Sequence, residues 1–432
     1  MSLREAARAI FEAALRAADV APLVRAALGA VELPARGRVL VVGAGKASGA
    51  MAAAAEAVLG DRIADGLVVV KDGYGAPTRR VRIVEAGHPV PDARGEAAAR
   101  EIRAISESAG ADDLLLVLVS GGGSALTPAP VPPITLADKQ AMTRLLLAAG
   151  ANINQLNAVR KHCSRLKGGQ LARAAAPARV HALLLSDVVG DPLDVIASGP
   201  TAPDTSTFAE ALGILDRFGL RERAPAAIVD RLERGRRGLV PETPKSDDPI
   251  FDRVTNTVIG NNRLVVDAAA SRASALGYRP QVLTRALEGE AREVAAQLCA
   301  LAREVQQGRG PVAAPACLIA GGETTVTVRG KGLGGRCQEF ALAAAVALDG
   351  RPGIVALAAG TDGTDGPTAA AGGLADGETA GRARRRGIDP PAALGENDSN
   401  PVLGALGDLV VTGPTSTNLL DLYLLLVEAS PA

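Results

Sequence analysis

A repeated order of short apolar runs, glycine-rich corners and alanine-rich helical stretches constrains the fold of this chain more than any other feature. Four instances fall in its first half, at residues 38–60, 66–75, 113–130 and 181–200. Continuous apolar strands that alternate with helices are typical of a parallel sheet covered on both faces. Ligands of such sheets bind beyond the carboxyl ends of the strands, which is where the glycine-rich corners lie. The pattern therefore predicts an α/β fold with its ligand site at these corners.

The pattern lapses once and then resumes, which predicts two α/β domains. Residues 221–252 form a helix followed by a segment rich in Pro, Ser and Asp, which is typical of a connection between domains. From residue 254 onward a second set of strands follows, and its TTVTV and LYLLLV runs indicate some antiparallel pairing. We expect residues 1–235 to form a Rossmann-like domain with a three-layer parallel sheet. We expect residues 236–432 to form a smaller mixed-sheet domain, with the active site in the cleft between the two.

Composition excludes several classes of function. The 47 basic residues balance the 47 acidic ones, and the 432 residues include three Tyr, five Phe and no Trp. A neutral chain with so few aromatic side chains is a poor candidate for a nucleic-acid binder or a peptide-binding groove, and any anion site must be local. The first 20 residues predict an amphipathic surface helix, and no apolar run reaches the ~18–20 residues of a membrane span. With four isolated cysteines, we expect a soluble cytoplasmic protein.

The first corner, VVGAGKASG, follows an apolar run and opens a helix. Gly43, Gly45 and Ser48 leave backbone amides open to an anion, and Lys46 adds a full positive charge. The corner is not a Walker loop, because Ala47 follows the lysine where a Ser or Thr is required. It matches the Rossmann fingerprint only in part, since Ser48 replaces the third glycine. The alternative is a plain packing turn between a strand and a helix.

The second corner follows the apolar run LLLVLV and consists of Ser120, Gly121, Gly122, Gly123 and Ser124. Three consecutive glycines in an ordered segment are unfavourable unless a positive φ or a close backbone approach requires them. Binding of a phosphate or a carboxylate is one such requirement, and we expect this loop to bind an anion. The alternative is a flexible surface loop.

A basic segment at 154–172 predicts a helix with two polar faces. Helical spacing places Asn157 and Lys161 on one face, and Arg160 and Lys167 on another. The segment contains no acidic residue, so it could bind an anionic ligand. The alternative is a solvated helix with exposed basic side chains.

Carboxylates follow the apolar run of 181–185. Asp187 lies at the strand end, and Asp191 follows four residues later. A carboxylate at that position can bind Mg²⁺ or accept a proton from a substrate hydroxyl. For Asp191, which precedes a proline, turn formation is the alternative.

In the second half of the chain, a glycine-rich segment directly precedes an arginine. Gly334 and Gly335 lead into Arg336 at the start of a helix, where the guanidinium and free amides can bind an oxyanion or carboxylate. Glu323 follows a strand end. Glu339 lies one helical turn beyond Arg336, and an ion pair between the two is the purely structural alternative.

A second acidic corner, TDGTDG, contains Asp362 and Asp365. Its carboxylates suit Mg²⁺ or a ligand hydroxyl, and Asp362 joins Asp187 and Asp191 as a candidate metal ligand. A plain turn explains the same residues equally well.

The ordered blocks together resemble the type II glycerate kinases, a family with a C-terminal MOFRL domain whose members were often labelled hydroxypyruvate reductases. The blocks are GAGKASGAM, GHPVPD, SGGGSAL, NAVRKHCSRLKGGQLA, LLLSDVVGD, IASGPTAPD, IGNN, GGETTVTV, GGRCQEF, GTDGTDGPTAAAGG and GPTSTN. The resemblance covers most of the chain and places the MOFRL region at about 315–427. It implies a two-domain α/β enzyme that transfers the γ-phosphoryl group of ATP, with Mg²⁺, to D-glycerate and forms 2-phosphoglycerate. It also implies active-site roles for Lys46, Asp187 and Arg336.

Phosphoryl transfer needs mainly positioned positive charge, backbone amides and Mg²⁺, which agrees with these corners. Our hypotheses are that Lys46 neutralises the transferring phosphate, that Arg336 binds the glycerate carboxylate or a phosphate, and that Asp187 orients the metal or activates the attacking hydroxyl. The expected partners are ATP and D-glycerate, with neither nucleic acid nor membrane, and a homodimer is one candidate assembly. Two alternatives stay open: an NAD(P)H-dependent hydroxypyruvate reductase, and a non-catalytic nucleotide or sugar-acid binding protein.

Overall fold

The computed structural model describes residues 1–429 and divides the chain into two compact units. Residues 20–259 form the first, which we call the N-terminal unit. Residues 1–19 and the chain from residue 260 onward form the second, the C-terminal unit. The boundary therefore lies further along the chain than the expected 235/236, and the first helix belongs to the C-terminal unit.

The N-terminal unit contains a six-stranded sheet of order β3-β2-β1-β4-β5-β6. The pairings of β1 with β2 and β4, of β2 with β3 and of β4 with β5 are all parallel. This order is that of the doubly wound dinucleotide-binding folds, in which the direction of winding reverses between the first and fourth strands. The strands are β1 (Val39–Ala44), β2 (Ile63–Lys71), β3 (Arg82–Ala86), β4 (Leu114–Val119), β5 (Arg179–Leu185) and β6 (Val254–Gly260).

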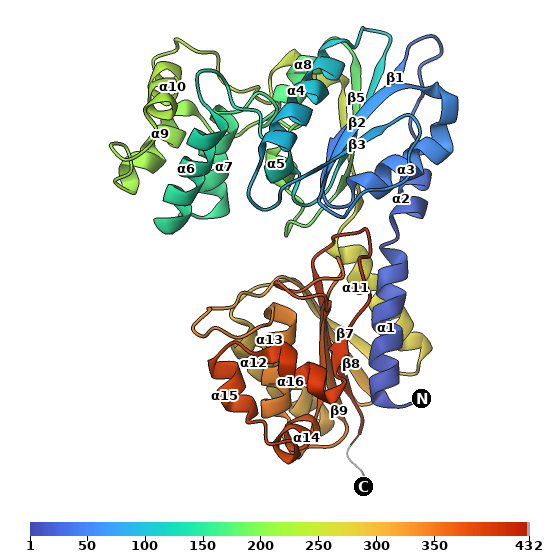
Figure 1. Ribbon diagram of the computed structural model, residues 1–432. Coiled ribbons are helices and arrows are strands. Elements are labelled where there is room, and N and C mark those ends of the chain that lie inside the picture. The colour runs from blue at the N-terminus through green and yellow to red at the C-terminus, as the bar shows by residue number, and fades with distance from the viewer. Residues whose placement is uncertain (430–432) are drawn as a thin grey trace. The chain divides into compact units, whose positions relative to one another are not determined.

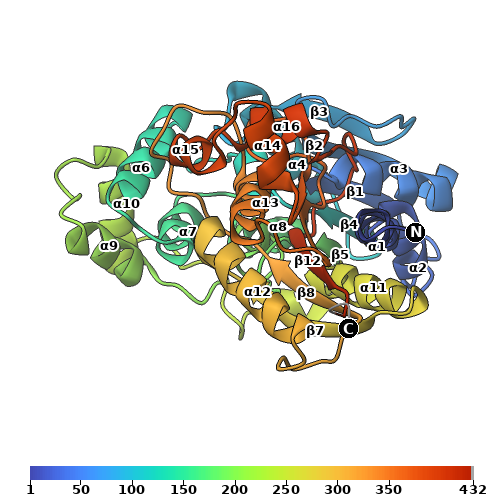
Figure 2. The same ribbon diagram turned by 90° about the horizontal axis from the view of Figure 1, so that it is seen from below.

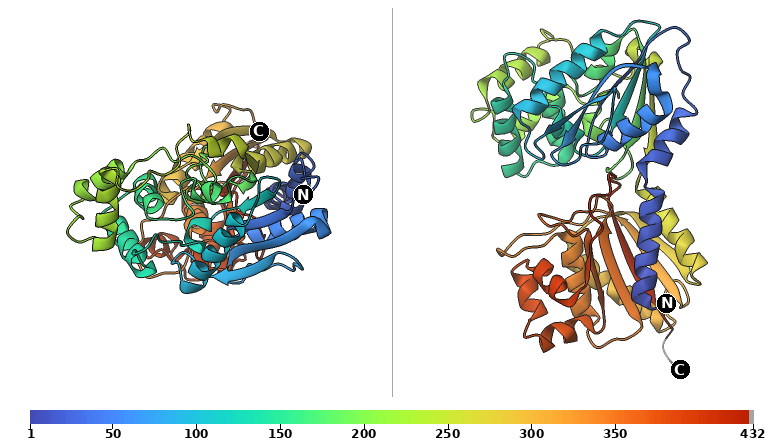
Figure 3. Two further views of the ribbon diagram at one scale, coloured as in Figure 1. Left: turned by 90° about the horizontal axis from the view of Figure 1, so that it is seen from above. Right: turned by 45° about the vertical axis from the view of Figure 1, so that its right-hand side comes forward.

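Helices of the N-terminal unit form two groups (Figures 1 and 3). Helices α3 and α4 pack on the sheet. Helices α6, α7, α9 and α10 lie beside the sheet around their own apolar core, which includes Met142, Leu156 and Phe208. The helices are α2 (Val20–Leu28), α3 (Ser48–Leu59), α4 (Ala93–Glu107), α5 (Gly123–Leu126), α6 (Leu136–Ala148), α7 (Ile153–His162), α8 (Gln170–Ala175), α9 (Phe208–Arg217) and α10 (Ala226–Arg236), with 3-10 turns η1 (Gly60–Arg62), η2 (Ile196–Ser198) and η3 (Pro249–Arg253).

The C-terminal unit contains a mixed six-stranded sheet of order β11-β10-β9-β12-β8-β7. Strands β7 and β8 pair in parallel, whereas β12 pairs antiparallel with both β8 and β9. The strands are β7 (Arg279–Leu287), β8 (Ala316–Gly322), β9 (Ile354–Gly360), β10 (Gly372–Asp376), β11 (Leu409–Val410) and β12 (Asp421–Val427). The helices are α1 (Leu3–Ala17), α11 (Asn262–Ala275), α12 (Ala291–Gln306), α13 (Arg336–Ala347), α14 (Thr379–Arg385), α15 (Pro390–Gly395) and α16 (Ser399–Leu406).

The predicted α/β class with one parallel and one mixed sheet is confirmed. Two segments nevertheless belong to a different unit from the one that the sequence predicted. Residues 254–259 extend the first sheet beside β5 instead of starting the second. The amphipathic helix α1 packs against α11, β9 and β12, because its apolar face, which includes Ile10 and Phe11, is buried there (Figures 1 and 2).

The antiparallel pairing expected of the second sheet is present, but TTVTV does not supply it. Of that run, Thr325 makes a single isolated bridge with Glu290, and the pairing comes from β8, β9, β10 and β12. Within residues 1–429, no helix combines the length and the apolar content that crossing a bilayer would require.

Candidate active site

Three glycine-rich or acidic corners leave the first sheet at the same level. In the strand register Ala44 pairs with Val119, and Val119 pairs with Leu184. Lys46, Gly121 and Ser186 therefore each lie two residues beyond a paired position, and Asp187 follows Ser186. Because β1, β4 and β5 are parallel neighbours, these residues leave one edge of the sheet, at the point where its winding reverses.

Hydrogen bonds fasten the first corner to the second. The backbone N–H of Lys46 donates to Gly121 O (2.8 Å), and that of Ala47 donates to Ser120 Oγ (2.9 Å). The Ser48 hydroxyl donates to Leu118 O (3.0 Å). The side chains of Ser48 and Ser120 are fully buried, so both hydroxyls serve to hold the two corners together.

Gly122 lies between Lys46 and His88. Its φ is +85°, and a Cβ at this position would lie 2.9 Å from His88 Nε2 and 3.7 Å from Lys46 Cγ. Only glycine adopts this conformation at low cost and also leaves room for the imidazole. The stem of Lys46 and the ring of His88 are thus set against the backbone of the second corner.

The remaining glycines of the two corners allow close backbone contact. At Gly43, an added Cβ would lie 2.1 Å from Leu118 O. At Gly45 it would lie 2.1 Å from Ser120 Oγ, and at Gly123 it would lie 2.6 Å from Ala44 O. These three positions therefore bring β1, β4 and their corners together, which is the packing alternative considered for the first corner.

A buried polar chain supports Ser124 at the end of the second corner. The hydroxyl of Ser198 donates to Asn157 Oδ1 (3.0 Å), and the hydroxyl oxygens of Ser198 and Ser124 lie 2.8 Å apart. Lys167 Nζ donates to Ser124 O (2.7 Å). Burial lowers the pKa of Lys167 well below its usual range. Asn157 therefore reaches the loop through Ser198, and Ser124 remains partly exposed.

The basic segment 154–172 is not one helix. Helix α7 ends at His162, and α8 starts at Gln170, so the two-faced pattern that required a continuous helix is wrong beyond residue 162. Lys161 is buried, and its ammonium lies 3.1 Å from Asp194 Oδ2 and 3.2 Å from Asp204 Oδ1. Its charge is therefore compensated within the fold.

Asp187 is half-buried and lies within a hydrogen-bonded turn. The Ser186 hydroxyl donates to Val188 O (3.2 Å) and accepts from Val188 N (3.3 Å), which bends the chain around Asp187. Asp191 adopts a positive φ of 55°, and its N–H donates to Val188 O (3.1 Å). Both carboxylates thus belong to one short loop beyond β5.

In the C-terminal unit, two carboxylates hold Arg336 at the start of α13. Its Nε and Nη2 donate to the two side-chain oxygens of Asp421 at 2.5 and 3.0 Å. Its Nη1 lies 2.5 Å from Glu323 Oε1. Burial alone would lower the pKa of Arg336, but the hydrogen bonds and charge of Asp421 raise it above its usual range. Asp421 is buried and Glu323 is exposed, so the guanidinium is fixed on one side and accessible on the other.

Arg336 and Glu323 line a pocket of about 560 Å³ within the C-terminal unit. Gly334 and Gly335 also line this pocket. Both lie close to neighbouring side chains: an added Cβ would lie 2.2 Å from Ser399 Oγ at Gly334 and 2.3 Å from Asp365 Cγ at Gly335. A pocket of this size with one arginine and one exposed carboxylate suits a small polar ligand.

Asp365 also lines this pocket, and it caps α13. Its carboxylate accepts from the backbone N–H of Cys337 (3.2 Å) and of Gln338 (2.9 Å). Burial raises the pKa of Asp365 to about 6, although the hydrogen bonds from Gln338 act in the opposite direction.

Two carboxylates of the second half make contacts within the C-terminal unit. Glu339 does not pair with Arg336; it contacts Arg292 and accepts from Asn397 Nδ2 (3.1 Å). Arg336 pairs instead with Asp421 of β12 and with Glu323. The carboxylate of Asp362 accepts from Thr364 N (3.0 Å), which is the plain turn considered as the alternative.

Within residues 1–429, no group of three or more His, Cys, Asp or Glu side chains is arranged to hold a metal ion. Of the three candidate metal ligands, Asp187 and Asp191 lie in the N-terminal unit, and Asp362 lies in the C-terminal unit. The expected cleft between the domains remains a prediction.

Three residues of the site were not singled out in the sequence. His88 belongs to the GHPVPD block, where the surrounding turn-forming residues give no catalytic pattern that would mark it. Ser198 follows Ala197 in a loop of left-handed backbone, with φ of 63° and 49° respectively. Asp421 begins the last strand, and only its position next to β8 and β9 brings it to Arg336.

Comparison with known families assigns most of the chain. Residues 6–233 match a family described as a domain of unknown function, DUF4147. Residues 316–421 match the MOFRL family. Each match falls largely within one of the two units.

Individual relatives match along the whole chain. A protein of Agrobacterium vitis, named provisionally as a hydroxypyruvate reductase, is 45% identical over 99% of this chain and 95% of its own length. A D-glycerate 2-kinase of Thermotoga maritima is 44% identical over 90% of this chain and 91% of its own. The crystal structure of a glycerate kinase from the same organism superimposes with a TM-score of 0.90 and 42% identity, and the match covers 99% of both chains.

Proposed function

Because the chain belongs to the family of two-domain glycerate kinases that join a DUF4147 domain to a MOFRL domain, we propose that it phosphorylates D-glycerate with ATP and forms 2-phosphoglycerate. The product assignment follows the name of the Thermotoga relative, which specifies the 2-position. The protein is thus an enzyme that acts on small molecules.

The observation that carries the proposal is the set of corners at the reversal point of the first sheet. Lys46, the loop of residues 120–124 and Asp187 leave β1, β4 and β5 at one level. Phosphoryl transfer depends on positioned cations and amide donors more than on covalent chemistry. One ammonium, a glycine-rich backbone and one accessible carboxylate are the groups that this chemistry requires.

In this mechanism Lys46 neutralises the transferring phosphoryl group. Its backbone is fixed by the bond to Gly121, and its stem lies near Gly122, so the ammonium is aimed without a large loss of side-chain entropy. The backbone of residues 121–123 is the proposed cradle for phosphate oxygens, with Ser124 as a hydroxyl donor. Because Ser48 and Ser120 are buried, we assign them to holding the cradle in shape.

Asp187 is the proposed acceptor of the proton from the attacking hydroxyl. As the new O–P bond forms, the bond between the γ-phosphorus and the bridging oxygen breaks, ADP leaves, and the hydroxyl proton moves to the carboxylate. Mg²⁺ fits the same residues, since it is commonly held by one or two carboxylates together with substrate phosphates, and here Asp187 with Asp191 would hold it. Bound there, Mg²⁺ would neutralise phosphate charge. Asp362 fits less well, because its carboxylate closes a turn with Thr364.

In the C-terminal unit, we propose that Arg336 binds an acid group of a substrate. Asp421 fixes its Nε and Nη2, while Nη1 lies against the exposed Glu323. An incoming carboxylate or phosphate can replace Glu323 at Nη1. Glu323 can then accept a hydrogen bond from a ligand hydroxyl.

A coupled assay on the purified protein tests the proposal. ADP release that requires both ATP and D-glycerate supports the kinase, and phosphorus NMR of the product identifies the phosphorylated hydroxyl. Absence of ADP release under saturating ATP, Mg²⁺ and D-glycerate would refute it.

The second candidate is an NAD(P)H-dependent hydroxypyruvate reductase, favoured by the name of the Agrobacterium relative and by the strand order of the first sheet. Its weakness is the first corner, where the buried Ser48 occupies the position of the third fingerprint glycine. Oxidation of NADH by hydroxypyruvate without ATP would establish this activity. A protein that binds ATP or D-glycerate without turnover in either assay would be a non-catalytic binder.

A further inference from the structure

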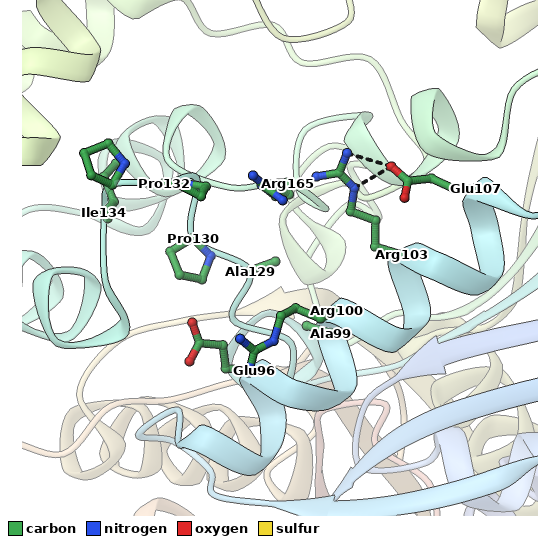
Figure 4. A pocket seen from close by; sticks show the side chains of 11 residues that line it. Glu96, Ala99, Arg100, Arg103, Glu107, Ala129, Pro130, Pro132, Ile134 and Arg165 are labelled. Atoms are coloured by element: carbon green, nitrogen blue, oxygen red, sulfur yellow. Dashed lines mark hydrogen bonds and ion pairs between the residues drawn. The ribbon is translucent and has the colours of Figure 1, made fainter.

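A second basic pocket lies in the N-terminal unit, and we call it the arginine pocket. It has two lobes of about 460 and 360 Å³, which share Arg103, Glu107 and Arg165. The first lobe lies between α4 and the segment 129–134, as Figure 4 shows. In the described chain, neither lobe is lined by Lys46, the loop of residues 120–124 or Asp187, so the arginine pocket is distinct from the corners at the sheet edge.

The charge of this pocket contrasts with that of the whole chain. The protein has a formal net charge of zero, yet the two lobes together contain five arginines and two acidic residues. The arginines are Arg100, Arg103, Arg165, Arg173 and Arg231, and the acids are Glu96 and Glu107. Such a local excess of positive charge attracts anions to the pocket.

Three of the arginines are fixed in place by the fold. Arg103 Nε donates to Glu107 Oε1 (2.8 Å), and Arg173 Nη2 donates to Asp248 Oδ2 (3.0 Å). Arg231 Nε donates to the carbonyl of His162 (2.6 Å). These anchors hold the remaining N–H groups in position before any ligand arrives, which lowers the entropy cost of binding.

The other two arginines are not held by an ion pair in the part of the chain that the structure describes. Within residues 1–429, neither Arg100 nor Arg165 makes a side-chain hydrogen bond or an ion pair, and both are exposed. Arg165 is nevertheless placed by its backbone, because its N–H donates to Ala129 O (2.8 Å). Figure 4 labels both residues: Arg100 lies on α4, and Arg165 lies on the segment between α7 and α8. Two guanidinium groups that make no ion pair within the described chain are thus presented to one cavity.

We propose that the arginine pocket binds a small anion with two acid groups, at least one of them a phosphate. Guanidinium groups bind phosphate and carboxylate oxygens in pairs, which favours arginine over lysine for such ligands. The first lobe contributes Arg100 and the second contributes Arg173 and Arg231, with Arg165 between them. Each lobe can therefore hold one acid group, and the lobe volumes suit a small metabolite.

Calorimetric titration with inorganic pyrophosphate and, separately, inorganic phosphate tests this site. The titrations use the full chain at fixed ionic strength and contain no ADP, because ADP itself carries two phosphate groups and would compete for the arginine pocket. The same titration of Lys46→Met reports any binding of pyrophosphate at the proposed active site. The variants are Arg100→Gln/Arg165→Gln and, as a matched control, Arg217→Gln, which removes an exposed arginine of α9 that lines neither lobe.

We expect pyrophosphate to bind the wild type about tenfold more tightly than phosphate, and the double variant to bind pyrophosphate about tenfold more weakly. Arg217→Gln should bind like the wild type. Equal weakening by the double variant and the control, or no weakening by either, would overturn the site. Equal affinity for phosphate and pyrophosphate would overturn the requirement for two acid groups.

Folding and turnover separate this proposal from the proposed function. Because the Arg100 and Arg165 side chains make no hydrogen bonds within the described residues, the double variant should unfold at the wild-type temperature and retain wild-type glycerate phosphorylation. Loss of that activity in the folded double variant would mean that the pocket belongs to the active site, which contradicts a separate site. Absence of kinase activity in the wild type would refute the proposed function. The proposal for the arginine pocket would remain, because the pyrophosphate titration measures binding and does not depend on turnover.

Discussion

Both side-chain oxygens of Asp421, the first residue of β12, bind the guanidinium of Arg336, the first residue of α13. The hydroxyl of Tyr423 donates to the same carboxylate at 3.1 Å. A buried carboxylate that is hydrogen-bonded on both oxygens sets the orientation of Arg336 before a substrate arrives. Asp421 is in this sense a positioning residue for the arginine.

Asp421→Asn should therefore lower both stability and activity. Removal of one partner of a buried ion pair leaves the other charge uncompensated, and we expect a loss of about 3 kcal/mol in the free energy of unfolding. We also expect kcat/KM to fall by one to two orders of magnitude, about as much as in Arg336→Ala. Glu323→Gln removes the exposed partner and should change stability by less than about 1 kcal/mol. Urea unfolding and steady-state kinetics measure both effects, and equal stability losses in the two variants would contradict the assignment.

Lys46→Met should reduce kcat while leaving the fold intact. We expect kcat to fall about 10²–10³-fold, which is the loss seen when an enzyme loses one donor to a developing oxyanion. The ammonium of Lys46 has the corresponding role here, because it interacts most strongly with the phosphoryl group during its transfer. The control is Lys71→Met, since Lys71 ends β2, on the far side of β1 from the reversal point. Steady-state kinetics at saturating ATP and D-glycerate measure kcat, and circular dichroism checks the fold. A Lys46→Met enzyme within threefold of wild type would remove this lysine from the mechanism.

Gly122→Ala should lower kcat/KM by more than the strain of a left-handed alanine alone would. The new Cβ would lie 2.9 Å from His88 Nε2, and φ is +85°. Gly73→Ala is a close control, because Gly73 has a φ of +81° but its new Cβ would meet no atom within 4 Å. Both variants should lose about 1–2 kcal/mol of stability from the left-handed conformation. Only Gly122→Ala should also lose tenfold or more in kcat/KM, and an equal loss in both would show that contact with His88 is unimportant.

Asp113 should make stability depend on pH in the acid range. The hydrogen bond from Arg38 lowers the pKa of Asp113 from its usual 3.8 to about 2, although burial acts in the opposite direction. Since the folded pKa is lower than the unfolded one, the stabilisation is present above pH 3.8 and is lost as the pH falls through about 2. With allowance for screening at the exposed Arg38, Asp113→Asn should cost about 1 kcal/mol at pH 7 and little at pH 2.

Urea unfolding of wild type and Asp113→Asn at pH 7, 4 and 2.5 measures this difference. Asp61→Asn removes an exposed carboxylate that pairs with Arg80, and it should change stability little throughout. A constant difference between wild type and Asp113→Asn at all three pH values would disprove the role of the Arg38 contact.

Local features of the sequence were sufficient for the elements and for the corners. The apolar runs that form β1, β4 and β5 are contiguous, and a glycine-rich or acidic corner follows each of them directly. The amphipathic repeat of residues 3–17 likewise predicts α1 from spacing alone. These signals could be read because they depend on neighbours in the chain.

The sequence by itself thus determined the α/β class, the strands with their corners and the presence of Lys46, Asp187 and Arg336 at element ends. Only the tertiary structure decided that α1 packs on the second sheet, that β6 joins the first, and that Asp421 rather than Glu339 pairs with Arg336. It also decided that Ser48 and Ser120 are buried between two corners. The physical reason is that these outcomes depend on contacts between distant segments, such as the 85 residues that separate Arg336 from Asp421. Spacing along the chain specifies periodicity and side-chain direction, but the partner of a buried charge is chosen by which strands and helices pack together.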